Sequence, residues 1–370
     1  MGQYLRPFLQ SSLTALYWKY DDSPYTRLSL DTLRQADPTL KSLHLLPYPT
    51  RSGDIDIVAA MQKTVQAMRH LQRATILPAG ILLEPLSSLS SLTHLRLEVP
   101  GEVVDHPSYF WLPSSAANFC RLQELTIVAP LDSYPRLTAF LDAISTRSLK
   151  ALRLSLIPSP RDRNTGGRDS RHIANSFRRV IDSCSAFVTL ELLMLGFEPN
   201  KPSRSVKLIE DSERFLSDDA VTPLFRLRSL VSLDLQDLPL SISSDGIERV
   251  LQNWPNMRAL YLGSNSSDTV HTATTIGDLR LFVSCTKLEH LGFAVTKFVR
   301  SHLDNFAAPE GDDDDALPVN PIIRCIYLRV FARPSGQDER YINSVLARVF
   351  PAASVRITRG PRAVGYSFRP

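Results

Sequence analysis

The stretch Leu92-Thr93-His94-Leu95-Arg96-Leu97 decides the fold, because its spacing of apolar residues returns along the whole chain. Two residues separate the first apolar position from the second, and one residue separates the second from the third. Successive leading residues lie between 21 positions apart, from Leu71 to Leu92, and 43 apart, from Phe187 to Leu230. Such a period indicates one supersecondary unit per copy. The other copies begin at Leu13, Leu40, Leu122, Leu149, Met257, Leu288 and Ile323, with a weaker one near Val355 and Ile357.

Each copy predicts a β-strand that is followed by a helix. The last two apolar positions alternate with polar ones, as in a half-buried strand, and the sequence between copies often has helical periodicity. That periodicity is clearest over residues 55–71, 173–184, 247–254 and 342–350. Repeated strand–helix units stack as a parallel sheet backed by helices, and neighbours complete one another's core. The sequence therefore predicts one α/β solenoid of about 11 to 12 units over residues 1–370, with the sheet on the concave face and the helices on the convex face.

The repeat resembles the leucine-rich repeat, and its long, irregular spacing resembles the repeats of F-box and leucine-rich-repeat proteins. As in that family, a Cys or Trp stands two or three residues before the leading apolar residue in four copies. The family's Asn or Cys after the strand is mostly missing. Proline, which lacks an N–H and fixes φ, stands there instead and is expected to end the strand. The four Cys and Trp residues are Cys120, Cys184, Trp254 and Cys285, and the prolines are Pro47, Pro78, Pro100, Pro130, Pro158 and Pro239.

The resemblance implies a protein–protein interaction module, and most directly the substrate-recognition part of an F-box-type ubiquitin ligase receptor. An F-box is a helical segment that precedes the repeats and docks the Skp adaptor, and the chain has no recognisable F-box pattern. Residues 1–9 instead read as the helix of a repeat whose strand begins near Leu13. A Skp adaptor is therefore expected as a partner only if an F-box lies upstream of Met1. Two explanations of the missing F-box fit the sequence: an upstream segment has been lost, or the protein is a relative that consists of repeats alone. The alternative function is a standalone leucine-rich-repeat scaffold or inhibitor with no link to ubiquitin.

Composition and motifs argue against several other classes of protein. The net charge of +4 is too small and too dispersed to indicate nucleic-acid binding. No apolar run approaches the roughly 20 residues of a membrane span, and the N-terminus lacks a signal-peptide pattern, so a cytoplasmic or nuclear protein is expected. The four cysteines form no CxxC pair, and three of them are assigned to the core by their shared repeat position. No nucleophile, metal-binding or phosphate-loop motif occurs, so no catalytic residue, cofactor or metal is expected.

Three segments rich in Pro, Asn, Ser and charged residues are predicted to be insertion loops. They lie near residues 158–171, 196–217 and 307–321. The third contains the run Asp312–Asp315, in which like charges repel and hold the chain open. A calcium loop needs alternating ligands, a Gly at a fixed offset and a final Glu, and this run lacks that spacing. It is predicted to be a solvated acidic loop.

The pleat of each strand turns the residue between the last two apolar positions towards the concave face, together with the residues on either side. Arg73, Arg96 and Arg153 are expected to make the first half of this surface basic. The histidines His44, His94 and His290 also fall on outward-facing positions, too far apart to share a metal ion. The full central row is Tyr17, His44, Thr75, Arg96, Thr126, Arg153, Glu191, Asp234, Tyr261, Gly292, Tyr327 and Arg356.

One part of this row is the predicted recognition surface. Arg153 is expected to pair with Glu191 on the next strand. Glu191 and Asp234 are expected to be adjacent carboxylates whose repulsion a cation of a partner would offset, with Tyr261 beside them. The alternative is that both carboxylates are simply hydrated. The predicted partner-binding residues are Arg96, Arg153, Glu191, Asp234 and Tyr261.

Overall fold

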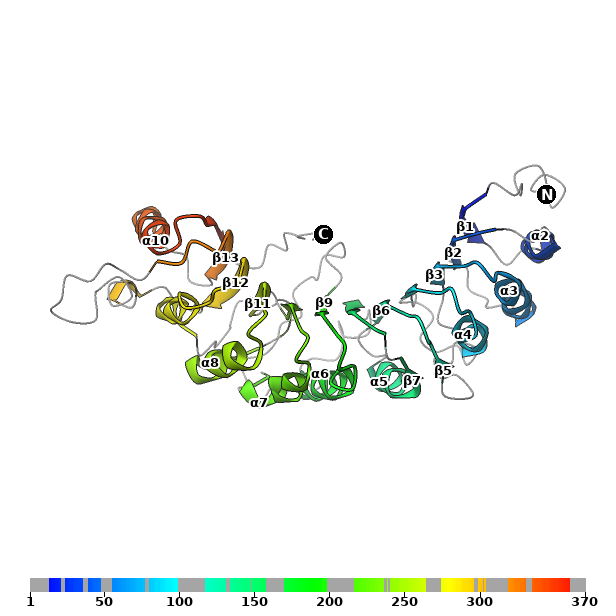
Figure 1. Ribbon diagram of the computed structural model, residues 1–370, viewed down its shortest axis with the longest axis horizontal. Coiled ribbons are helices and arrows are strands. Elements are labelled where there is room, and N and C mark those ends of the chain that lie inside the picture. Colours follow the sequence, from blue (N-terminus) through cyan, green and yellow to red (C-terminus); the bar gives the residue numbers. More distant parts are fainter. Residues whose placement is uncertain are drawn as a thin grey trace. The chain divides into compact units, whose positions relative to one another are not determined.

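The computed structural model divides the chain into two compact units, which we describe separately. Unit 1 covers Met1–Pro160 and unit 2 covers Arg161–Pro370. Each is an α/β unit with a parallel sheet and a layer of helices (Figure 1). The structure describes residues 13–20, 24–35, 39–47, 55–76, 80–98, 117–130, 134–146, 148–157, 170–197, 216–235, 238, 240–263, 274–295, 299–301, 303, 319–330 and 335–359.

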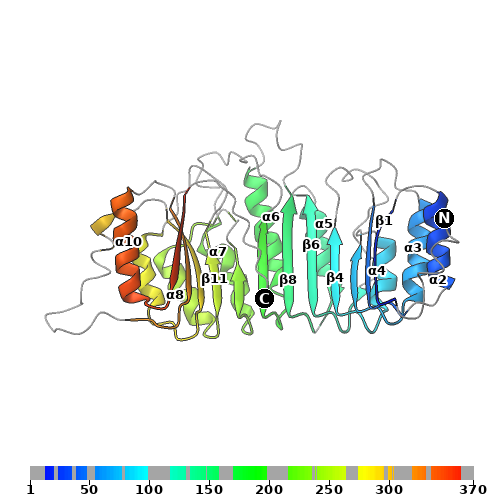
Figure 2. The ribbon, with the colours of Figure 1, turned by 90° about the horizontal axis from the view of Figure 1, so that it is seen from above.

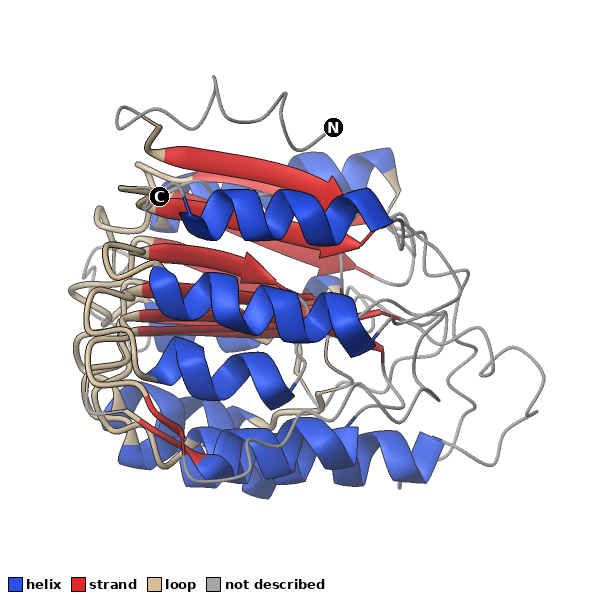
Figure 3. Cartoon of the chain, turned by 90° about the vertical axis from the view of Figure 1, so that its right-hand side faces the viewer, coloured by secondary structure: helices blue, strands red, loops and turns tan. Residues whose placement is uncertain are grey.

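Unit 1 has a sheet of parallel strands whose order in space follows their order in the chain. The strands run side by side in the same direction, and the helices of the unit lie on one face of the sheet (Figures 1 and 2). The elements of unit 1 lie in front in Figure 3, where its strands and helices lie along roughly the same direction. The strands are β1 (Ala15–Tyr20), β2 (Ser42–Pro47), β3 (Arg73–Ile76), β4 (His94–Glu98), β6 (Glu124–Pro130) and β8 (Ala151–Ile157). The helices are α2 (Pro24–Gln35), α3 (Ile55–Ala67), α4 (Gly80–Ser87) and α5 (Tyr134–Ala143), and a separate two-stranded sheet pairs β5 (Ala117–Asn118) with β7 (Ile144–Ser145).

Unit 2 repeats this arrangement. Its strands are also parallel and in chain order. The strands are β9 (Leu192–Phe197), β10 (Ser232–Asp234), β11 (Ala259–Leu262), β12 (His290–Val295), β13 (Cys325–Val330) and β14 (Ser354–Arg359). The helices are α6 (Ser170–Cys184), α7 (Asp218–Val221), η4 (Thr222–Arg226), α8 (Ser244–Asn253), η5 (Ile276–Phe282) and α10 (Gly336–Val349).

The predicted α/β architecture of strand–helix repeats is confirmed in both units. A strand lies at every copy of the apolar spacing except the one at Phe187. The apolar side chains of the strands turn towards the helices: Leu95 and Leu97 of β4 are buried while Arg96 between them is half-exposed. Helices occupy the four stretches with predicted helical periodicity. Pro47 and Pro130 are the last residues of their strands, as expected of a residue that cannot donate a ladder hydrogen bond.

The predicted alignment of one repeat was wrong by three residues. We expected the copy at Phe187 to place Glu191 in the central row, but the register pairs Met194, not Glu191, with Asp234. The strand is formed by a second copy of the spacing that begins at Leu190, so that Leu193 and Leu195 face the helices and are buried. Glu191 precedes β9, and its side chain is exposed. The two carboxylates are therefore not neighbours in one row.

Besides the hydrogen bonds within the sheet, one backbone hydrogen-bond pattern repeats at the amino ends of the strands. The carbonyl of the residue that follows each leading apolar residue accepts two N–H groups from the next repeat: Gln72 O accepts from Thr93 N at 2.9 Å and from His94 N at 3.0 Å. Because buried backbone carbonyls must be paired, this pattern fixes the register of each strand against the next. It recurs at Thr14, Lys41, Thr93 and Gln123 in unit 1 and at Glu191, Val231, Arg258 and Glu289 in unit 2.

The predicted core position of the cysteines was wrong for Cys120. Cys120 is exposed, and its neighbour Phe119 is buried in the position three residues before the leading Leu122. Cys184 is buried at the end of α6, as predicted, and its carbonyl accepts the N–H of Phe187 at 3.1 Å, whereas Cys285 is half-buried. In six repeats the residue three before the leading position closes a tight turn, in which its carbonyl accepts the N–H of the leading residue. The residues in this position include Met68, Leu89, Phe119, Phe187, Leu227 and Trp254.

The three predicted insertion loops lie mostly outside the described residues, and so does the expected helix over residues 1–9. The single solenoid over residues 1–370 stays a prediction. Among the described helices, none combines the length and apolar character that a membrane crossing requires.

Candidate recognition surface

The face of each sheet opposite the described helices is the candidate surface, and we call it the open face. In unit 1 its central row runs from Tyr17 on β1 to Arg153 on β8, as predicted, and it includes Arg96. A flanking row two residues earlier contains Arg73, His94 and Glu124. The buried residues alternate with these two rows, so the open face carries polar side chains on a rigid sheet.

A charged cluster on the open face of unit 1 centres on Glu124, which the sequence did not single out. One carboxylate oxygen lies 3.4 Å from Nε2 of His94, and the other lies 3.2 Å from Nη1 of Arg153. Arg153 therefore pairs with Glu124 of the neighbouring strand, where Glu191 was the predicted partner. Arg96 pairs with Glu98 two residues along β4. These half-exposed pairs contribute less than about 1 kcal/mol each, so their main effect is to orient the side chains.

The open face of unit 2 carries a row of different chemistry. Across β10 to β14 the register aligns Asp234, Tyr261, Gly292, Tyr327 and Arg356. The row thus has a carboxylate at one end, a guanidinium at the other and two phenol rings between them. Asp234 and Tyr261 were both predicted to lie here, and the structure places them side by side.

Tyr261 is held in place by the absence of a side chain at Gly292. A Cβ atom on Gly292 would lie 2.2 Å from Cδ1 of Tyr261, so the ring occupies the space above the glycine. The ring centroids of Tyr261 and Tyr327 are 5.9 Å apart, and the guanidinium carbon of Arg356 lies 5.9 Å from the Tyr327 ring. Burial raises the pKa of Tyr261 well above its ordinary value, and the neighbouring Tyr327 and Asp234 raise it further. Tyr261 is therefore a neutral phenol with a fixed ring.

We expect Gly292→Ala to lower the free energy of unfolding by about 2 kcal/mol, because the new methyl group displaces the Tyr261 ring from a packed site. The matched control is Gly336→Ala, since a Cβ on Gly336 meets nothing within 4 Å. Urea unfolding followed by circular dichroism measures both. In the double variant Gly292→Ala/Tyr261→Ala the clash is gone, so the combined loss should be smaller than the sum of the two single losses. Strict additivity would show that the ring and the glycine are not coupled.

The described histidines, cysteines and carboxylates that could act in a site are spread over several strands and helices. No group of three or more His, Cys, Asp or Glu side chains within them could hold a metal ion. His44 and His94 both lie on the open face, on strands separated by β3. Burial raises the pKa of the Cys285 thiol to about 11, so this cysteine is protonated at neutral pH and a poor nucleophile.

This thiol leads to a prediction about pH. Because the raised pKa favours the neutral thiol, the thiolate of Cys285 is scarce at pH 8 and accumulates only as the pH approaches about 11. At pH 8 we therefore expect iodoacetamide to modify the exposed Cys120 at least tenfold faster than Cys285, and mass spectrometry of peptides measures both rates. The rate at Cys285 should still rise above pH 9.0, the ordinary value for cysteine. A plateau of that rate near pH 9.0 would contradict the prediction.

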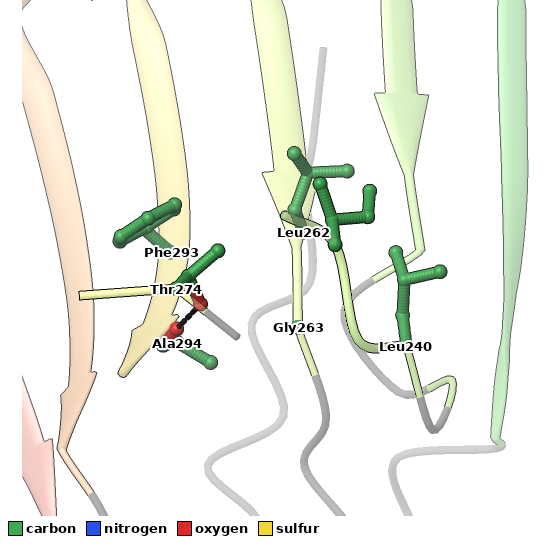
Figure 4. Close-up of a pocket in the computed structure, with 7 residues that line it drawn as sticks. Leu240, Leu262, Gly263, Thr274, Phe293 and Ala294 are labelled. Carbon is green, nitrogen blue, oxygen red and sulfur yellow. Dashed lines mark hydrogen bonds between the residues drawn. The ribbon is translucent and has the colours of Figure 1, made fainter. Parts of the chain in front are cut away.

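A small apolar pocket lies at the carboxyl ends of β11 and β12 in unit 2 (Figure 4). The only side-chain hydroxyl among the residues that line the pocket is that of Thr274, and it donates to the carbonyl of Ala294 at 2.9 Å. Gly263 has a φ of 120°, and a Cβ there would lie 2.3 Å from that of Ala294, so only glycine fits. Apart from the paired hydroxyl of Thr274, the side chains that line the pocket are apolar. Its lining residues are Leu240, Ile242, Leu262, Gly263, Thr274, Phe293 and Ala294.

No protein-family model matches the chain, and no curated protein sequence matches it.

Proposed function

We propose that the chain is a leucine-rich-repeat protein whose open faces recognise another protein, as the substrate-binding part of an F-box-type ubiquitin ligase receptor. The observation that carries the proposal is the row Asp234, Tyr261, Tyr327 and Arg356, in which the packed ring of the buried Tyr261 lies against Tyr327, and Asp234, Tyr327 and Arg356 remain accessible on one sheet face. Tyrosine and arginine are enriched at the energetic centres of protein interfaces. Side chains that are already ordered lose little conformational entropy when a partner binds.

The repeat geometry supports the leucine-rich-repeat part of the proposal. Each repeat places two apolar residues of its strand against the helix layer, and the carbonyl next to its leading residue pairs with the next repeat. An array of this kind buries one continuous core and leaves the other sheet face available for binding. Catalysis would then belong to the proteins that the receptor brings together.

The first experiment tests the link to ubiquitin. Residues 1–370, and a version extended by the reading frame upstream of Met1, are each co-expressed with a Skp-family adaptor and separated by size-exclusion chromatography. Co-elution of either version with the adaptor supports the receptor function. Separate elution of both versions favours the alternative, a scaffold or inhibitor with no link to ubiquitin.

The second experiment tests recognition by the open face. Proteins cross-linked to the wild-type chain in cell extract are compared with those cross-linked to the variant Asp234→Arg/Tyr327→Ser. The matched control is Glu248→Arg/Asn343→Ser, because it changes the net charge equally and both residues are exposed, on helices α8 and α10. A partner lost from the open-face variant and kept by the control supports the proposal. Identical partners for all three chains would remove the open face of unit 2 from it.

A further inference from the structure

We propose that the open face of β1 to β3 in unit 1 binds an acidic segment of a partner protein. The surface consists of Tyr17, Lys19, His44 and Arg73, and we call it the basic edge. The inference rests on the proposed function in protein recognition and adds the chemistry of the partner. It concerns a different part of the chain from the tyrosine row of unit 2.

The geometry of the basic edge follows from the strand register. His44 on β2 pairs with Tyr17 on β1 and with Thr75 on β3. Lys19 lies two residues after Tyr17 on β1, and Arg73 lies two residues before Thr75 on β3. Lys19, His44 and Arg73 therefore form a diagonal line across three neighbouring strands. With strands about 4.8 Å apart and about 3.3 Å per residue, successive members are roughly 8 Å apart at the backbone.

The charge of the basic edge is not balanced within the described part of unit 1. Strands β1, β2 and β3 contain no Asp or Glu. Lys19 and Arg73 are exposed, and neither forms an ion pair with another described residue. On β4, β6 and β8 of the same face, by contrast, Arg96 and Arg153 each have a carboxylate partner. Among the described residues, the two cations of the basic edge therefore have no carboxylate partner, and we infer that carboxylates of another molecule can supply one.

Tyr17 gives the basic edge an apolar anchor. Its side chain is 62% exposed, the most exposed large hydrophobic residue among those described. Its ring nevertheless has a defined position, because it contacts the ring of His44 with 5.7 Å between centroids. An exposed tyrosine beside an arginine and a lysine combines the residue types that anchor partners at interfaces with charges that orient them.

A peptide fits this surface better than a nucleic acid does. The cations lie on one diagonal line of three strands, and the net charge of the chain is only +4, whereas nucleic-acid binding relies on many phosphate contacts. Alternate side chains of an extended peptide project on the same side and are about 7 Å apart. Lys19 and Arg73 are two steps of the diagonal apart, so two acidic residues four positions apart in such a peptide would come close to one cation each, with the residue midway between them near His44 and Tyr17.

The test uses a fluorescein-labelled peptide of alternating glutamate and glycine, with the glutamine version of that peptide for comparison. Fluorescence anisotropy measures binding to the full chain. We expect the glutamate peptide to bind and the variant Lys19→Glu/Arg73→Glu to bind it at least about tenfold more weakly. The matched control is Lys63→Glu/Arg69→Glu, which changes the net charge equally at exposed residues of α3 and the turn after it. The control should bind like the wild-type chain, and circular dichroism verifies that both variants are folded.

Three results would overturn the inference. The first is no binding of the glutamate peptide, or equal binding of the glutamine peptide. The second is an equal loss in the variant and the control, which would indicate a general effect of net charge. The third is tighter binding of a single-stranded oligonucleotide that depends on Lys19 and Arg73, which would assign the surface to nucleic acid. Because this test needs neither the Skp adaptor nor the unit 2 row, its failure leaves the proposed function standing.

Discussion

Replacing Asn320 by alanine is expected to lower the free energy of unfolding of unit 2 by about 4 kcal/mol. The side chain is buried, and its amide nitrogen lies 3.1, 3.0 and 2.9 Å from the carbonyl oxygens of Phe282, Val283 and Cys285. Its amide oxygen accepts the N–H groups of Ile322 and Ile323. Asn320 thus joins the end of η5 to the turn before β13. Each buried backbone group left without a partner costs about 1–3 kcal/mol, and several lose theirs together.

Urea unfolding, followed by circular dichroism, measures this loss. The matched control is Asn343→Ala on the exposed side of α10, which should change stability by less than about 0.5 kcal/mol. Hydrogen exchange adds a local readout, because the amides of Ile322 and Ile323 should exchange faster in the Asn320 variant. Equal stability of the two variants would show that water replaces the side chain without cost.

The position of Asn320 shows what a repeat pattern can and cannot predict. It stands three residues before the leading Ile323, where other repeats have Met68, Leu89 or Trp254. The apolar spacing therefore gives the location of the strand. It does not reveal that a polar residue takes this core position, because the carbonyls that satisfy it come from η5, more than thirty residues earlier in the chain.

The misplaced repeat at β9 has a similar physical cause. Phe187, Leu190 and Leu192 have the predicted spacing, and so do Leu190, Leu193 and Leu195. Backbone hydrogen bonds distinguish these two possible alignments. The N–H of Leu190 donates to the carbonyl of Phe187 at 3.0 Å, and the carbonyl of Glu191 accepts the N–H groups of Val231 and Ser232. Sequence periodicity predicts which repeats exist, and backbone hydrogen bonds decide the register where several apolar residues follow one another.

The sequence predicts which residues lie in the rows of the candidate surface, but it does not predict which of their side chains form ion pairs. The strand pleat correctly placed Arg96, Arg153, Asp234 and Tyr261 on the open faces. The ion pair of Arg153 with Glu124 is diagonal, because Glu124 lies two residues before Thr126, the register partner of Arg153. Side-chain length and rotamer decide such diagonal contacts, and the strand pattern alone contains neither. A list of both open-face rows, rather than of the central row alone, would have included Glu124.

Trp254 stands three residues before the leading Met257, and its carbonyl closes the turn that precedes β11. Trp254 is buried at the end of α8, and its ring meets that of Phe225 edge to face with 5.3 Å between centroids. Removing an aromatic side chain of this size leaves a large cavity. We expect Trp254→Ala to lower the free energy of unfolding of unit 2 by about 4 kcal/mol.

Trp254→Phe separates the packing of the ring from its polar atom. The indole Nε1 is buried and has no hydrogen-bond partner among the described residues, so the N–H group is desolvated without compensation. Phenylalanine removes that donor and keeps most of the apolar contact, and we expect a loss of less than about 1.5 kcal/mol, measured by urea unfolding. A loss in Trp254→Phe as large as that in Trp254→Ala would mean that the N–H group is paired and stabilising. The smaller loss would show that this core position depends on the volume of the aromatic ring and not on the N–H group.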